Sequence, residues 1–197
     1  MIIDEQLLSL GADYKEYQIN EMIFSEGETP QYYIQIAQGK AKLNNYSEKG
    51  KEFIHGIVSK NESLVETSIF LEKPYPVNAV AIEDCKVLRL PKSNYKSFLS
   101  ENPELYEKLV FALSEKLHYQ YMMMHSISFL SPEKRLTTLM DYLKNNHEDQ
   151  SLYSLQIPFT RQQLASLTAL SVETVIRVIK NMEKDRILKI QNRKIFY

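Results

Sequence analysis

Apolar and polar residues alternate with a period of two from Tyr17 to about Leu90. The alternation is clearest in YYIQIAQGKAKLNNYSEKGKEFIHGIV, where Gly39 and Gly50 interrupt it at points suited to tight turns. Two further apolar runs, VNAVAI and KVLRL, follow. Many short strands at spacings of roughly 8–12 residues are typical of a sandwich or barrel. Because no strand–helix alternation occurs here, the pattern argues against a nucleotide-binding parallel sheet.

The period becomes helical near residue 93. SNYKSFLS fits a short helix, and a longer one can begin after the capping residue Asn102, with Pro103 in its first turn. No Gly or Pro follows until Pro132, so about 28 residues span roughly 42 Å. The residues on or near one stripe of this helix are Leu105, Leu109, Ala112, Lys116, Leu117, Met124 and Ile127. Its length favours a dimer-forming helix that joins two domains, and a helix buried within one chain is the alternative.

Two capped helices are predicted within TRQQLASLTALSVETVIRVIK, residues 160–180. Thr160 and Gln163 form a T-x-x-Q capping box, and Ser171 can cap the second helix. The core positions around the short turn are Leu164, Leu167, Leu170, Val175 and Val178. Such spacing is typical of a helix-turn-helix. A helix capped by Ser131 precedes the pair, YSLQIPF can form a strand, and DRILKIQNRKIFY alternates around QNR as a two-stranded wing. At the other end of the chain, residues 2–10 fit a short helix.

The outer side of the second helix combines Glu173, Ile176, Arg177 and Lys180. In a helix-turn-helix, the N-terminal half of this helix meets base edges in the major groove. Arg177 can present its fork to guanine O6 and N7, Glu173 can accept from cytosine N4, and Ile176 can meet a thymine methyl. Residues placed to reach phosphates are Thr160, Arg161, Gln162, Ser171, Thr174 and Lys180. The alternative for Glu173 and Arg177 is a solvated i,i+4 ion pair, which contributes about 0.2–0.5 kcal/mol.

Charge is unevenly distributed, although the net charge of the whole chain is −1. Residues 131–197 carry 11 Lys and Arg against 7 Asp and Glu, whereas residues 1–130 carry 13 against 18. Unless it arose by chance, this asymmetry indicates a basic working surface near the C-terminus. The one cysteine, Cys85, excludes an internal disulfide and a cysteine-based metal site, and is typical of a small buried strand residue. No stretch reaches the roughly 18–20 apolar residues of a membrane-spanning helix, and a cytoplasmic protein is expected.

The C-terminal motif carries a family resemblance. RQQLASLTALSVETVIRVIKNMEKDRIL resembles the winged helix-turn-helix of the Crp/Fnr transcription regulators, with its R-Q-x-[IL]-A/G and S-x-E-T-V-x-R-x-[IL] elements. Upstream, MIFSEGETPQYYIQIAQGKAKL resembles the family's cyclic-nucleotide-binding-type β-roll, and FLSPEKRLTTLMDYL resembles its hinge and first DNA-domain helix. The resemblance implies a homodimer that binds a near-palindromic DNA site, with Glu173 and Arg177 in base-reading positions and RNA polymerase as a further partner.

The chain departs from the family pattern at the nucleotide pocket. The family pairs a G-E turn with a later R-[ST]-A that grips the cyclic phosphate, whereas NESL keeps Glu62 behind Asn61, and PYPVNAV contains no Arg. Because a desolvated phosphate needs a paired positive charge, binding of cAMP or cGMP is not expected. Glu62, Tyr75 and Asn78 are the candidate effector-pocket residues, and no cofactor or metal is expected. Ala169 occupies the position of the family's turn glycine.

These patterns predict an α+β fold in three parts. A jelly-roll-like β-roll sensor domain is expected at residues 1–100, a dimerisation helix and hinge at 101–130, and a winged helix-turn-helix DNA-binding domain at 131–197. The predicted function is that of a sequence-specific transcription regulator with an unidentified small-molecule effector. The sequence contains no constellation of catalytic residues, and an enzyme is therefore not expected. Two alternatives remain. One is a sensor module that acts on protein partners, which a salt-dependent gel shift would distinguish from a DNA-binding regulator. The other is a regulator that binds DNA without any effector.

Overall fold

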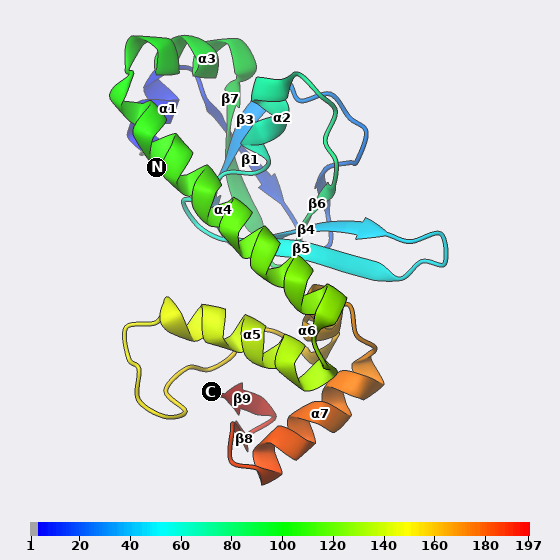
Figure 1. The fold of residues 1–197 in the computed structure, drawn as a ribbon. Coiled ribbons are helices and arrows are strands. Elements are labelled where there is room, and N and C mark those ends of the chain that lie inside the picture. The colour runs from blue at the N-terminus through cyan, green and yellow to red at the C-terminus, as the bar shows by residue number, and fades with distance from the viewer. Residues whose placement is uncertain (1–3) are drawn as a thin grey trace. The chain divides into compact units, whose positions relative to one another are not determined.

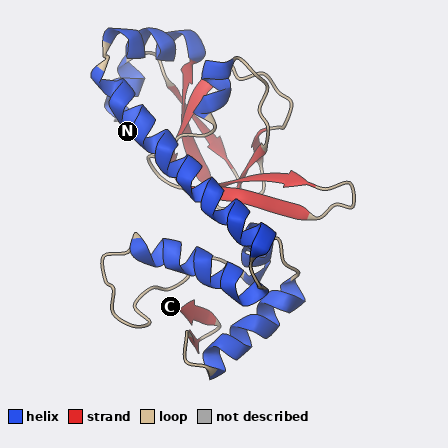
Figure 2. Cartoon of the chain, in the orientation of Figure 1, coloured by secondary structure: helices blue, strands red, loops and turns tan. Residues whose placement is uncertain are grey.

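The computed structural model describes residues 4–197, which divide into two compact units at residues 115 and 116. Figure 1 labels the elements, and Figure 2 shows that the large sheets lie in the first unit, together with several helices, whereas the second unit is mainly helical. The predicted mixture of a β-sheet domain, a long helix and a helix-turn-helix is confirmed. The first unit contains α1 (Asp4–Ser9), β1 (Asp13–Tyr17), β2 (Met22–Phe24), β3 (Tyr32–Gln38), β4 (Ala41–Tyr46), β5 (Glu52–Val58), α2 (Glu66–Leu71), β6 (Asn78–Ala81), β7 (Cys85–Pro91) and α3 (Lys92–Glu101).

Two antiparallel sheets build this first unit, one in the order β1-β7-β3 and the other in the order β2-β6-β4-β5. The alternation seen in the sequence therefore does mark short antiparallel strands. Gly39, which joins β3 to β4, has φ +83, and a Cβ atom there would lie 2.3 Å from the carbonyl oxygen of Asp84. This turn consequently requires glycine for both its backbone conformation and its space.

The strands bury two apolar clusters. The first contains Tyr17, Phe24, Ile34, Ile36, Ala41, Val58, Leu64, Tyr75, Ala79, Ala81, Cys85 and Val87. The second contains Leu7, Tyr33, Ile69, Leu88, Leu90, Tyr95 and Leu99, so α1 and α3 pack on β7 through it. The short helix expected at residues 2–10 is confirmed as α1, except that Ile2 and Ile3 lie outside the described residues. Burial raises the pKa of the Cys85 thiol to about 11, as fits a buried strand residue rather than a reactive one.

One long helix, α4 (Glu104–Phe129), follows as predicted. Its two long sides differ. Leu105 and Leu109 pack against the second apolar cluster of the first unit. Another side of the helix leaves Val110, Leu117 and Tyr121 between 51% and 60% exposed. The single stripe expected from the sequence therefore needs correction, because Leu105 and Leu109 pack on the core of their own unit whereas Leu117 is exposed.

The second unit contains the end of α4, then α5 (Pro132–Asn145), α6 (Arg161–Thr168), α7 (Val172–Lys184), β8 (Lys189–Gln191) and β9 (Lys194–Phe196). Ser131 caps α5 by accepting a hydrogen bond from the backbone N–H of Lys134, as expected. The segment YSLQIPF, expected as a strand, pairs with the end of the chain through an isolated bridge between Gln156 and Phe196 and through backbone hydrogen bonds that join Leu155 to Tyr197 and Ile157 to Ile195. Helices α5, α6 and α7 enclose a core that includes Leu136, Leu139, Met140, Leu164, Leu167, Val175, Ile179 and Met182.

Candidate nucleic-acid interface

Helix α6 begins at the predicted capping box. The Thr160 hydroxyl oxygen accepts from the backbone N–H of Gln163 at 3.1 Å, and the Gln163 side-chain oxygen accepts from the backbone N–H of Thr160 at 2.9 Å. Both bonds satisfy N–H groups that a helix start otherwise leaves unpaired. The box therefore fixes where α6 starts.

The turn between α6 and α7 is short and strained. Ala169 ends α6 in the left-handed region, with φ 56 and ψ 26. Glycine adopts this conformation at lower free energy than alanine does. Leu170 is buried beside the turn, and Ser171 caps α7 by accepting from the backbone N–H of Thr174 at 3.2 Å. The chain thus turns between two capped helices within three residues, as the helix-turn-helix pattern predicts.

Helix α7 is sharply two-sided. Val175, Val178, Ile179 and Met182 are all buried. On the other side Glu173, Ile176, Arg177 and Lys180 are exposed, with Ile176 42% accessible. An apolar side chain that is this exposed, between an acid and a base, has no packing role within the unit. The face described by these four residues is called the reading face below.

Glu173 is held as a hydrogen-bond acceptor on the reading face. Hydrogen bonds from its own backbone N–H and from the Ser171 side chain hold the pKa of this carboxyl below its usual range. Within the described residues, no ion pair joins Glu173 to Arg177. The solvated i,i+4 pair is therefore not formed in this structure, and both side chains are exposed.

The expected phosphate-contacting residues lie at the starts of α6 and α7 and, for Lys180, on the reading face itself. Thr160, Gln162, Ser171 and Lys180 are exposed at the starts of α6 and α7 or along α7. Thr174 is half-buried, and its hydroxyl oxygen lies 3.1 Å from the Ser171 hydroxyl. Hydroxyl and amide donors at two helix starts suit phosphate oxygens, since the helix dipole adds to their attraction.

Arg161 departs from this expectation in part. One guanidinium nitrogen, Nη1, donates to the carbonyl oxygen of Arg193 at 2.6 Å, which links α6 to the hairpin of β8 and β9. The remaining N–H groups of this half-buried side chain keep their donor capacity. Arg161 therefore holds the hairpin in place in addition to any phosphate contact.

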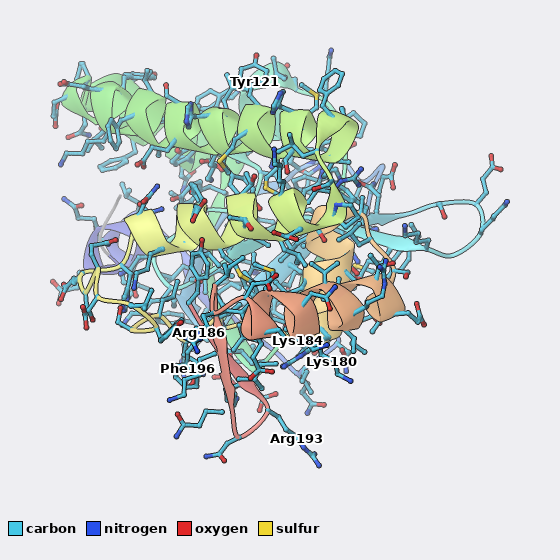
Figure 3. All side chains as sticks on the ribbon, turned by 60° about the horizontal axis from the view of Figure 1, so that its bottom comes forward. Tyr121, Lys180, Lys184, Arg186, Arg193 and Phe196 are labelled. Atoms are coloured by element: carbon cyan, nitrogen blue, oxygen red, sulfur yellow. The ribbon has the colours of Figure 1, made fainter. Side chains whose placement is uncertain are left out.

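Several basic residues of this unit were not assigned a role from the sequence. They are Lys184, Arg186, Lys189, Arg193 and Lys194, all exposed. Figure 3 shows Lys180 and Lys184 on α7 and Arg193 at the outer end of the hairpin. The sequence indicated these residues only through the excess of Lys and Arg after residue 158. A charge count does not show on which surface of the folded unit each residue lies.

The three candidate effector residues have structural contacts in the first unit. The Glu62 carboxylate is exposed and accepts from the backbone N–H of Ser59 at 2.6 Å. The Tyr75 ring is buried and stacks on Phe24, with the ring centroids 3.8 Å apart. Asn78 accepts from the backbone N–H of Glu26 at 2.9 Å. These contacts account for each residue without a ligand, and their role toward an effector stays a prediction.

Two turns of the first unit place a glutamate directly after a residue with positive φ. Asn61 has φ 70 and precedes the exposed Glu62, whereas Val65 has φ 46 and precedes the buried Glu66. Glu66 accepts from the Ser63 hydroxyl at 2.8 Å. A β-branched residue with positive φ is a steric outlier, so the position of Val65 is one where glycine would be the low-energy choice. Val65 and Glu66 therefore match the family's G-E turn at least as well as Asn61 and Glu62 do.

A β-roll of two antiparallel sheets, a long helix and a winged helix-turn-helix together define a DNA-binding transcription regulator with a sensor-type domain. Family models agree part by part: a cyclic nucleotide-binding domain matches residues 14–102, and a Crp-like helix-turn-helix domain matches residues 134–196. The chain belongs to the Crp/Fnr family of transcription regulators, which are not enzymes.

Individual relatives are distant in sequence and close in fold. The transcriptional activator protein FnrA of Stutzerimonas stutzeri is 24% identical over 177 residues, covering 89% of this chain and 72% of that protein. The cAMP-activated global transcriptional regulator CRP of Haemophilus influenzae is 23% identical, with 88% and 78% covered. A CooA mutant from Carboxydothermus hydrogenoformans superposes with a TM-score of 0.84 at 14% identity, over 100% of this chain and 87% of that one. In the part of the chain that the structure describes, no helix combines the length and the apolar character that crossing a membrane requires.

Proposed function

We propose that this regulator binds a near-palindromic DNA site as a homodimer. The observation that carries the proposal is the reading face of α7, where Glu173, Ile176 and Arg177 are exposed together at the N-terminal half of the helix. In a helix-turn-helix this half of the second helix lies along the base edges of the major groove. Exposed donors and acceptors at adjacent positions are what direct readout requires.

Each of the three side chains fits one kind of base edge. The Arg177 fork matches the O6 and N7 acceptors of guanine, and the ionised Glu173 accepts from the amino group of cytosine. Ile176 offers only apolar contact, for which a thymine methyl is the matching group. The surrounding Thr160, Arg161, Gln162, Ser171, Thr174 and Lys180 contact phosphates and set the register of α7 on the duplex.

The homodimer is inferred from the exposed side of α4. Val110, Leu117 and Met124 recur every seven residues, and Tyr121 lies between the last two. All four are at least 51% exposed, and Figure 3 shows Tyr121 on the side of α4 away from α5. An apolar heptad seam of this kind pairs with a second copy of itself in a coiled coil. A two-fold dimer presents two reading faces, which accounts for a palindromic site.

We further propose that cAMP does not regulate the protein. Residues 74–80 contain no arginine to pair with a cyclic phosphate. Tyr75, which lies within this segment, places its ring in the roll core beside Phe24. Burial, together with Glu28 and Tyr17, raises the pKa of Tyr75 to about 12, so the side chain is uncharged at neutral pH. A phosphate desolvated there without a cation is strongly disfavoured. A different small-molecule effector, sensed through Glu62, Tyr75 and Asn78, and contact with RNA polymerase belong to the same proposal.

Selection of bound sequences from random DNA tests the function directly. The full-length protein is expected to enrich two inverted half-sites centred about one helical turn, roughly 34 Å, apart. Affinity for the selected site falls as salt rises, because phosphate contacts release counterions. Enrichment of a single half-site contradicts the homodimer. Absence of any enriched sequence contradicts sequence-specific reading, and a sensor that acts through protein partners then becomes the better account.

Thermal unfolding with added cyclic nucleotide tests the effector proposal separately. A ligand present at 100 times its dissociation constant stabilises the folded state by about 2.7 kcal/mol. If cAMP does not bind, the melting temperature of the sheet unit stays unchanged when about 1 mM cAMP is added. This concentration is roughly the upper end of typical substrate concentrations. A rise of several degrees would refute this part of the proposal and leave the DNA-binding part standing.

A further inference from the structure

The turn at the tip of the β8–β9 hairpin has an unusual residue choice. Gln191 pairs with Lys194, so Asn192 and Arg193 form a two-residue turn, and their φ values are 50 and 62. Two positive φ values in sequence are the mark of the type I′ hairpin turn, in which Asn-Gly is the preferred pair. Asn192 follows that preference, but an arginine stands where glycine would fold with less strain. A strained residue at an exposed tip makes its side chain a candidate for a function of its own.

The hairpin is fixed to the rest of its unit at both ends. At the tip, the carbonyl oxygen of Arg193 accepts from Nη1 of Arg161 at 2.6 Å. At the base, the backbone N–H of Ile190 donates to the Glu183 carboxylate at 3.0 Å, and Ile195 is buried. These contacts tie the hairpin to α6 and to α7. The exposed Arg193 side chain therefore extends from an anchored hairpin. Figure 3 shows Arg193 at the outer end of this hairpin.

The position of the tip relative to DNA follows from the proposed function. With α7 in the major groove, the start of α6 lies on the phosphate backbone that borders this groove. Arg161 is the first residue of α6, and it holds the hairpin tip. The tip thus lies at that same backbone strand, and the next groove beyond the strand is the minor groove. An arginine side chain is long and planar enough to enter a narrow minor groove, whose negative potential attracts it.

We propose that Arg193 inserts into the minor groove that flanks each half-site, and that the protein therefore selects A·T base pairs in the operator flanks. This inference rests on the proposed DNA reading by α7. The minor groove displays acceptor atoms at A·T and T·A pairs alike, whereas G·C adds the protruding guanine amino group. Reading by Arg193 consequently separates A·T from G·C without separating A·T from T·A. Arg177 in the major groove distinguishes all four pairs, and a phosphate contact distinguishes none.

The test uses the full-length protein and operators with constant half-sites and varied flanks. The flanks carry A·T, T·A, G·C or inosine·C, the last being a G·C pair without the minor-groove amino group. The wild type is expected to bind the A·T, T·A and inosine·C flanks roughly tenfold more tightly than the G·C flank. Equal affinity for all four flanks overturns the proposal.

Two variants and one control identify the residue. R193G relieves the backbone strain, so it is expected to keep or raise the melting temperature while losing the flank preference. R193K keeps the charge but not the planar fork, and is expected to lose most of the preference. K194A, a change at the next exposed residue of β9, should weaken binding equally on every flank. If R193G instead weakens binding equally on every flank, Arg193 is a phosphate contact and the proposal is wrong.

The half-sites report on the proposed function independently. Changing a base pair inside a half-site lowers wild-type affinity if α7 reads it, whatever the flanks contain. Half-site discrimination without flank preference therefore refutes the role of Arg193 alone. Loss of half-site discrimination as well refutes the proposed function itself, and the inference about the hairpin falls with it.

Discussion

The candidate residues of the two units differ in how far they are engaged within the fold. In the sheet unit, Glu62, Tyr75 and Asn78 are engaged by neighbours within the fold. In the helical unit, Glu173 and Arg177 are exposed and unpaired with each other. A surface that binds DNA has to present its groups in advance, because a duplex cannot enter a cavity. The contrast teaches that exposed chemistry in the second unit is the more informative guide to what this protein binds.

The largest expected effect tests whether the units are stable independently. Leu164→Ala removes a side chain buried in the helical unit and should destabilise that unit by roughly 2–5 kcal/mol. Calorimetry should show its transition at a lower temperature, with the transition of the sheet unit unmoved. Ile36→Ala, a change in the core of the sheet unit, is the matched control and should move only the other transition. A single transition that moves with both changes would show that the units unfold together.

The second prediction separates the two sides of α4. Leu117→Glu places a charge on the exposed seam, and each copy of the side chain contributes about 1.5–3 kcal/mol when a dimer buries it. Sedimentation should therefore show monomers while the melting temperature of the sheet unit is kept. Leu109→Glu should lower the melting temperature of the sheet unit and leave the dimer intact, because Leu109 packs into that unit. Dimers that survive the change at Leu117 would contradict the seam.

The third prediction concerns the reading face. Arg177→Ala should remove roughly 1–3 kcal/mol of discrimination at one base pair of each half-site, because a bidentate contact to guanine is lost. Binding to operators with every single base change would locate that pair. Lys180→Ala, on the same face, is the control and should weaken all sequences alike. The same uniform loss for Arg177→Ala would make it a phosphate contact.

The smallest expected effect concerns the buried thiol of Cys85 in the sheet unit. Burial raises the pKa of Cys85 from 9.0 to about 11, so the folded state disfavours the thiolate. At pH 8 this leaves roughly 100-fold less thiolate than in the unfolded chain, and alkylation should be slow until the unit unfolds. Because the folded pKa is raised, the associated stability is present below pH 9 and is lost as the pH rises toward 11. Cys85→Ala should remove that part of the alkaline loss, and rapid alkylation of the native protein would contradict it.

The sequence was most informative where structure depends on neighbouring residues. The capping box of Thr160, the cap at Ser171 and the wing around QNR were all predicted and are confirmed, because each is local hydrogen-bonding or turn chemistry. The two sides of α4 could not be distinguished in this way. Leu109 and Val110 are adjacent and both apolar, and only the tertiary fold decides which one meets the core.

Long-range pairing also hid the environment of the candidate effector residues. Tyr75 stacks on Phe24, which is far away in the sequence, so no local pattern shows that its ring fills the roll. The anchoring of the wing was hidden for the same reason. Alternation predicted the hairpin, but the bond from Arg161 to Arg193 joins residues 32 positions apart. The predicted division at residues 100 and 130, and the DNA contacts themselves, stay predictions.

The left-handed conformation of Ala169 leaves the protein a route to higher stability. A single methyl group keeps the link between α6 and α7 above its lowest attainable free energy, and Ala169→Gly would release roughly 1 kcal/mol. Single mutations commonly lower stability by about this amount. A lineage or a laboratory selection that acquires glycine at this position could therefore explore new residues along the reading face and still fold.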